Sequence, residues 1–241
     1  MIEIIEGITI NPAAILLGIL TGIFYPKDIP QKTQNWIHTL LAAFMLYIAG
    51  RIVIYEALAS FTHFLISVIF CWLCLILGAT LFRRSPAPQK ISALAHTAKT
   101  RFVAQAKKHG TWETTLLIGT AFFSLTPLTF AASALFGCYA DPRLFIAKGV
   151  MDLLGVFVFT RTLKIKAIAV ILPVIILQFI LVQLFGCVAS THITTGMTTV
   201  GLVIVYLCLH SSLILLGWNK TGTLFSYVPA LFLALIVDAI W

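Results

Sequence analysis

The sequence predicts an all-α fold, a polytopic bundle of transmembrane helices with about seven or eight spans. Of the residues, 60% are hydrophobic and only 10% are charged, and the mean hydropathy is +1.04. A soluble globular domain carries about 25% charged residues, so this class is excluded. Apolar stretches near the ~20 residues that a helix needs to cross a bilayer recur along the chain. We therefore expect a single transmembrane domain over residues 1–241.

These stretches give about eight expected spans, each long enough to cross the hydrocarbon core. They cover residues 8–25, 36–56, 61–82, 113–137, 143–162, 167–186, 197–217 and 223–240. In this topology every Lys and Arg except Arg51, Arg143 and Lys148 lies on one side of the membrane. By the positive-inside rule that side is the cytoplasm, which places both termini outside a multi-pass cell inner membrane. The acidic N-terminus lacks the basic region of a cleaved signal peptide, so we expect it to remain.

The net charge of +8 reflects these basic residues between spans, and we do not expect a nucleic-acid partner. Residues 83–112 form the one substantial loop, which is expected to be cytoplasmic and includes the breaker Ser85-Pro86-Ala87-Pro88. From Ile91 to Lys108 apolar residues recur at helical spacing, and basic residues fill much of the rest. This pattern predicts a basic amphipathic helix that binds anionic lipid headgroups of the bilayer. A tether with incidental amphipathicity stays open as the alternative.

The fifth expected span carries Lys148 and Asp152 into an otherwise apolar run. An ionisable side chain in hydrocarbon costs about 2.5–3.5 kcal/mol on insertion scales, so such residues normally face a bundle interior and pair. Because the two residues are four apart, a helix places them on one face within pairing distance. The sequence therefore predicts a polar intramembrane site, with Lys148 about 7 Å and Asp152 about 13 Å below the outer boundary.

Arg51 and Gln178, on two other spans, are further candidates for this site. Arg51 lies about five residues from the outer end of the second span, where it either snorkels to the interface beside Glu56 or lines the site. Gln178 on the sixth span falls near the depth of Asp152, so it either completes a polar cluster or bonds a neighbouring helix. Both alternatives stay open for each residue.

The first span begins Gly7-Ile8-Thr9-Ile10-Asn11-Pro12 and continues through Gly18 and Gly22. Pro is tolerated at a helix start, so Asn11 either caps this helix or joins the polar site. The spacing of the two glycines is a small-xxx-small pattern, which predicts close approach of a neighbouring backbone.

The fourth span contains Thr126-Pro127 about 16 Å from its outer end, close to the bilayer midplane. Pro removes one helix hydrogen bond and leaves a carbonyl free, so we expect a kink that either lines a cavity or simply bends the helix. Asn11-Pro12 and Thr126-Pro127 are both followed by small residues, and an offset of three spans between them would give inverted repeats.

Other kinds of chemistry have weak support in the sequence. No Ser/His/Asp grouping or pair of catalytic carboxylates stands at mechanistic spacing, so we expect neither an enzyme nor a cofactor. Cys71 and Cys74 form a C-x-x-C within a span, which favours packing over metal binding, and no two histidines share one helix at ligand spacing. Cys138 and Cys187 each follow Leu-Phe-Gly at an expected outer helix end. A disulfide between them requires their Cα atoms to lie within about 7 Å. The sequence does not fix that distance, so the bond stays open.

Several short motifs, taken in order, resemble one family. They are Gly7-x-Thr9-x-Asn11 with Gly18 and Gly22; Thr126-Pro127-Leu128; Asp141, Leu144, Lys148 and Asp152; Leu172-Pro173 with Gln178; Val200-Gly201; Leu215-Leu216-Gly217; and Val228-Pro229-Ala230-Leu231. Together they resemble the bacterial YqgA/YdfK-like integral membrane proteins, domain of unknown function 554. The resemblance implies a multispanning inner-membrane protein, suspected to be a transporter, with no established activity. Gly149, Leu153 and Ile214 depart from the Ser, Gly and Asn of the family.

Buried charges near interrupted helices are the usual marks of a translocation site, so the sequence favours a transporter of a small solute or ion. The expected lining is Lys148, Asp152, Gln178, Arg51, Thr126 and Asn11. Lys148 would attract an anionic group or serve as counter-ion to Asp152, which would take a proton or a cation. The rival hypothesis is a non-transporting scaffold that binds lipids or partners through the 83–112 loop, and deletion of Ile91–Lys108 distinguishes the two. Both hypotheses are compatible with a homo-oligomer.

Overall fold

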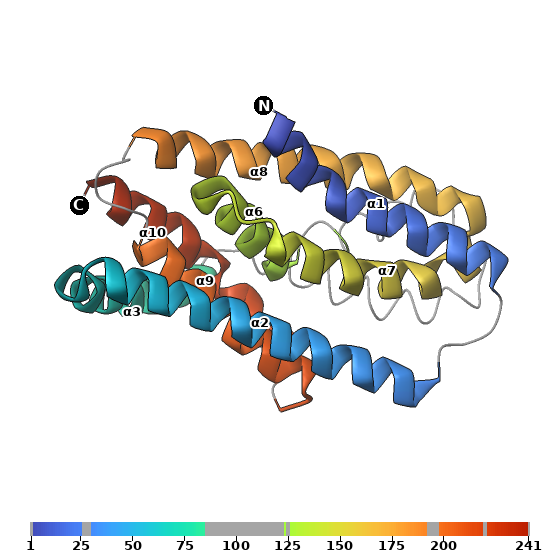
Figure 1. Ribbon diagram of the computed structural model, residues 1–241, viewed down its shortest axis with the longest axis horizontal. Coiled ribbons are helices and arrows are strands. Elements are labelled where there is room, and N and C mark those ends of the chain that lie inside the picture. Colours follow the sequence, from blue (N-terminus) through green and yellow to red (C-terminus); the bar gives the residue numbers. More distant parts are fainter. Residues whose placement is uncertain are drawn as a thin grey trace.

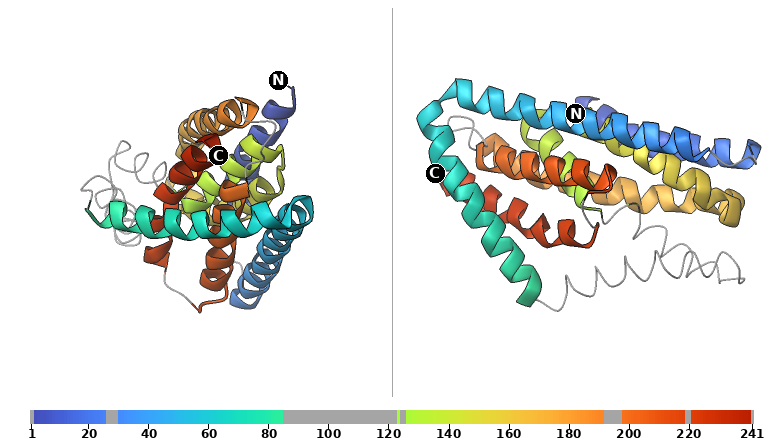
Figure 2. Two further views of the ribbon diagram at one scale, coloured as in Figure 1. Left: turned by 90° about the vertical axis from the view of Figure 1, so that its left-hand side faces the viewer. Right: turned by 90° about the horizontal axis from the view of Figure 1, so that it is seen from below.

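The computed structural model describes residues 2–25, 30–84, 123, 126–191, 198–218 and 221–240. Within these ranges every regular element is a helix, which confirms the all-α fold class. The elements are α1 (Ile2–Phe24), α2 (Gln31–Ala59), α3 (Phe61–Arg84), α6 (Pro127–Tyr139), α7 (Arg143–Leu163), η1 (Lys164–Val170), α8 (Ile171–Thr191), α9 (Thr198–Leu215), η2 (Thr221–Tyr227) and α10 (Val228–Ile240). Figure 1 shows α1 beside α7 and α8, whereas α3 crosses the other helices steeply in both views of Figure 2.

Five helices in the described part of the chain are long and apolar enough to cross a membrane, so the fold is compatible with a membrane protein. They are Gly7–Phe24, Gln31–Ala59, Phe61–Arg84, Ala167–Ser190 and Thr198–Leu215. Two further expected spans form shorter apolar helices, Pro127–Tyr139 and Leu224–Ile240. The expected amphipathic helix of the loop lies outside the described residues, although Arg83 and Arg84 still belong to the last turn of α3.

The backbone of α7 lies directly against small residues of α1. A Cβ atom added at Gly18 would be 2.7 Å from the carbonyl oxygen of Leu153, and one added at Gly22 would be 2.8 Å from that of Phe157. Since no side chain fits at such distances, the two glycines allow the close backbone approach that their spacing predicts. Residue numbers at these contacts increase in the same direction along both helices, so α1 and α7 are parallel neighbours (Figure 1).

The first expected span, 8–25, agrees with the apolar segment Gly7–Phe24 of α1, but the capping role considered for Asn11 is wrong. Helix α1 begins at Ile2 and contains Pro12 in its interior, so Asn11 is a mid-helix residue and not a cap. Membrane helices tolerate internal Pro, because neighbouring groups can satisfy the backbone groups that it releases. The capping position predicted from Pro12 does not apply, because α1 already begins at Ile2, before the apolar segment.

The expected kink at Thr126-Pro127 is instead the start of a helix. Thr126 is extended, with φ −91° and ψ 146°, and its side-chain oxygen accepts from the backbone N–H of Thr129 at 3.3 Å. Pro127 occupies the first turn, where its missing N–H costs nothing. Phe123, which precedes Thr126 by three residues, is helical, and its side chain is buried. Asn11-Pro12 therefore differs in local structure from Thr126-Pro127. The match between these two pairs no longer supports the inverted repeat, which stays a prediction.

Replacing Gly18 by Ala should lower the free energy of unfolding by about 1–3 kcal/mol, because the new methyl group would overlap the backbone of Leu153. The matched control is Gly50→Ala, where an added Cβ has no neighbour within 4 Å. The control should be neutral or stabilising by up to about 1 kcal/mol. The unfolding midpoint of each variant in detergent checks this, and equal midpoints would contradict the packing.

Candidate functional site

Lys148 and Asp152, both on α7, bind one another inside the bundle. Lys148 is 1% exposed and Asp152 is 7% exposed. The ammonium of Lys148 donates a hydrogen bond to the Oδ2 atom of Asp152, which also makes the ion pair expected from their spacing of four residues. A buried pair of this kind contributes little net stability, whereas loss of one partner costs about 3–5 kcal/mol. The pair is thus poorly explained as a stabilising element.

The backbone just before α6 supplies a second partner to Lys148. The Nζ atom donates to the backbone carbonyl of Phe123 at 2.9 Å. In a continuous helix this carbonyl would accept from the N–H of residue 127, but Pro127 has no N–H. Thr126 does not contact the ammonium: its hydroxyl bonds that of Thr129 at 2.8 Å. Thr126 therefore shapes the interruption, and the carbonyl of Phe123 faces the charge.

Asn11 and Gln178 are fully buried amides. The amide of Asn11, on α1, lies beside the carboxylate of Asp152, although no hydrogen bond of ordinary geometry joins them. Gln178, on α8, makes no hydrogen bond through its amide within the described residues, so the bond to a neighbouring helix considered for it does not form there. An unbonded buried polar group costs about 1–3 kcal/mol and calls for an explanation such as water or a ligand.

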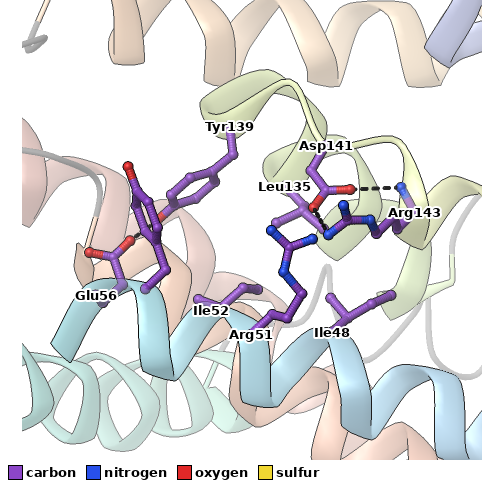
Figure 3. Close-up of a pocket in the computed structure, with 9 residues that line it drawn as sticks. Ile48, Arg51, Ile52, Glu56, Leu135, Tyr139, Asp141 and Arg143 are labelled. Atoms are coloured by element: carbon purple, nitrogen blue, oxygen red, sulfur yellow. Dashed lines mark hydrogen bonds and ion pairs between the residues drawn. The ribbon is translucent and has the colours of Figure 1, made fainter. Parts of the chain in front are cut away.

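Arg51 lies elsewhere, in a cavity of about 250 Å³ that we call the Arg51 cavity (Figure 3). Its lining consists of Ile48, Arg51, Ile52, Tyr55, Glu56, Leu135, Tyr139, Asp141 and Arg143, and includes neither Lys148 nor Asp152. The structure therefore places Arg51 in the same cavity as Glu56 and away from the lining role beside the Lys148–Asp152 pair.

Asp141 and Arg143 form one wall of the Arg51 cavity. Asp141 accepts from the backbone N–H of Arg143 at 3.0 Å and from its guanidinium at 3.3 Å (Figure 3). Burial raises the pKa of Asp141, and the nearby guanidinium of Arg51 opposes that rise. Two guanidinium groups thus face a single carboxylate on this side of the cavity.

Glu56 is a buried carboxylate that the sequence analysis treated only as a neighbour of Arg51. Its Oε1 atom accepts from the hydroxyl of Tyr139 at 3.0 Å, and its Oε2 atom accepts from the hydroxyl of Thr198 at 2.8 Å. Glu56 therefore joins α2 to α6 and α9. The signal that singled out Lys148 and Asp152, a charge within an apolar segment, was also present here.

Asp238, near the end of α10, caps helix α9. Its carboxylate accepts from the backbone N–H of Thr199 at 3.2 Å and from that of Val200 at 2.8 Å. The first N–H groups of a helix lack partners within the helix, and a carboxylate there also interacts favourably with the helix dipole. Sequence spacing does not reveal this role, because the capping side chain belongs to α10 and not to the residues that precede α9.

The cysteines are free in the described residues, so the disulfide left open between Cys138 and Cys187 is not formed. The two helix ends do meet, since a Cβ at Gly186 would be 3.4 Å from the carbonyl oxygen of Gly137. However, the thiol of Cys138 lies 4.0 Å from the carbonyl of Phe185, and Cys187 is exposed. Cys71 and Cys74 are buried in the main core, which fits packing.

Comparison with known proteins bears on the chain as a whole. A family model described as "Protein of unknown function (DUF554)" matches residues 6–239. The chain belongs to this family. The match to the DUF554 family extends from α1 into α10 and confirms the resemblance drawn from the motifs. No curated protein and no solved structure matches the chain.

Replacing Asp238 by Ala should lower the free energy of unfolding by about 1–3 kcal/mol, because two buried N–H groups of α9 lose their acceptor. Asp238→Asn keeps one acceptor oxygen and should cost less. Unfolding midpoints of the two variants in detergent test the cap. If Asp238→Ala unfolds like the wild type, the carboxylate does not support α9.

Proposed function

We propose that this DUF554 protein is a transporter of a small solute or ion, with Lys148 and Asp152 at its translocation site. The observation that carries the proposal is the position of the Lys148 ammonium, which bonds both Asp152 and the backbone of an interrupted helix. Transporters commonly place their binding sites at discontinuous helices, where backbone groups released from the helix can bind a ligand. Ionisable residues within membrane helices likewise mark ion and substrate pathways.

The buried amide of Asn11 supports the same assignment, because it adds a polar group to the surroundings of Asp152. In this proposal Lys148 attracts an anionic group or acts as counter-ion, and Asp152 takes a proton or a cation. Gln178 and the Arg51 cavity belong to the wider pathway rather than to the ion pair. The protein acts in the cell inner membrane with both termini outside, as the distribution of basic residues predicts.

Transport can be tested in proteoliposomes with radioactive sodium, a pH-sensitive dye for protons, and radiolabelled succinate as a small anion. Asp152→Asn and Lys148→Ala should each reduce the flux by about tenfold or more, since a bond to a charged group contributes about 1.5–3 kcal/mol. Lys32→Ala is the matched control, because Lys32 is an exposed cation at the start of α2. Wild-type flux in both site variants would remove the pair from the pathway.

A further inference from the structure

We infer that the ammonium of Lys148 occupies a binding site for a monovalent cation, formed by the carboxylate of Asp152, the carbonyl of Phe123 and the amide of Asn11. Lys148 is then a built-in cation that the external one must displace. This inference rests on the proposed function and narrows it, since it names the ligand class of the same site.

The groups around the ammonium are those that a hard cation prefers. Its two bonded partners are both oxygen atoms, the carbonyl of Phe123 at 2.9 Å and Oδ2 of Asp152. Hard cations take carboxylate, carbonyl and amide oxygens as ligands, and released backbone carbonyls coordinate Na⁺ in interrupted membrane helices. A cation at the position of Nζ would meet the same two oxygens.

The amide of Asn11 is the independent observation that points to a ligand. It is fully buried, lies beside Asp152, and forms no hydrogen bond of ordinary geometry. The backbone at Asn11 packs on α7, since a Cβ atom added at Gly149 would lie 3.9 Å from the Cα atom of Asn11. Turned by 180° about its terminal bond, which exchanges its nitrogen and its oxygen, this amide would present an oxygen to an ion bound by Asp152.

The charge balance selects a monovalent cation and an exchange with Lys148. Asp152 has one negative charge, and Lys148 already neutralises it. A second cation beside both would leave an uncompensated positive charge in the bundle interior, which is costly. When Lys148 withdraws, one monovalent ion restores neutrality, whereas a divalent ion would leave an excess charge. The flexible four-carbon stem of lysine permits such a withdrawal.

The test compares purified wild type with Lys148→Met and with the double variant Lys148→Met/Asp152→Asn. Unfolding midpoints are measured in sodium chloride and in choline chloride at equal ionic strength, in mildly alkaline buffer that favours the ionised carboxylate. In choline, Lys148→Met should unfold earlier than the wild type. Sodium at about a hundred times its dissociation constant should raise its midpoint by about 5–10 °C. The double variant should show no such rise.

A sodium response that is absent in Lys148→Met, or equal in the double variant, overturns the inference. If Lys148→Met does not fold, the wild type and Asp152→Asn take its place: a rise in midpoint that sodium causes only in the wild type supports the site, and its absence overturns it. If sodium binds as expected but none of the three solutes tested in proteoliposomes shows flux, this inference stands and the proposed transport is rejected. Transport of another solute without cation binding would reject the inference alone.

Discussion

The bond from Lys148 to the carbonyl of Phe123 is the interaction on which the polar centre depends. Pro127 cannot donate to that carbonyl, and a buried acceptor without a donor is costly. The ammonium satisfies it at 2.9 Å, but an ammonium in an apolar bundle itself requires a negative partner, which Asp152 provides one turn further along α7. The carboxylate in turn lies beside Asn11. The carbonyl of Phe123 therefore accounts for the ion pair on α7, and the carboxylate of that pair lies beside the amide of Asn11 on α1.

The parts of this arrangement that the sequence predicted are governed by local spacing. Lys148 and Asp152 are four residues apart, and a helix brings such residues together whatever the surrounding fold. Gly18 and Gly22 follow the same logic, because residues four apart share a face and only glycine lets two backbones approach closely. The sequence did not identify α7 as the neighbour, since spacing along one helix contains no information about its partner.

The contacts that could not be predicted from the sequence join segments that are far apart along the chain. Asp238 bonds N–H groups nearly forty residues earlier, and Glu56 bonds hydroxyls on two other helices. No periodicity encodes such pairs. Arg51 was assigned an approximate depth but not a helix face, so its cavity could not be separated from the ion pair. The capping alternative for Asn11 is wrong because α1 continues through Pro12, as membrane helices tolerate.

The carboxylates of Glu56 and Asp238 have a mechanical consequence. They join the ends of α2, α6, α9 and α10, so these ends can separate only by giving up several bonds to charged groups, at about 1.5–3 kcal/mol each. The glycine contacts unite α1 and α7 in a similar way. The chain passes from α6 of the first group to α7 of the second through the short turn at Asp141, at the edge of the Arg51 cavity. That turn is where a hinge between them would bend.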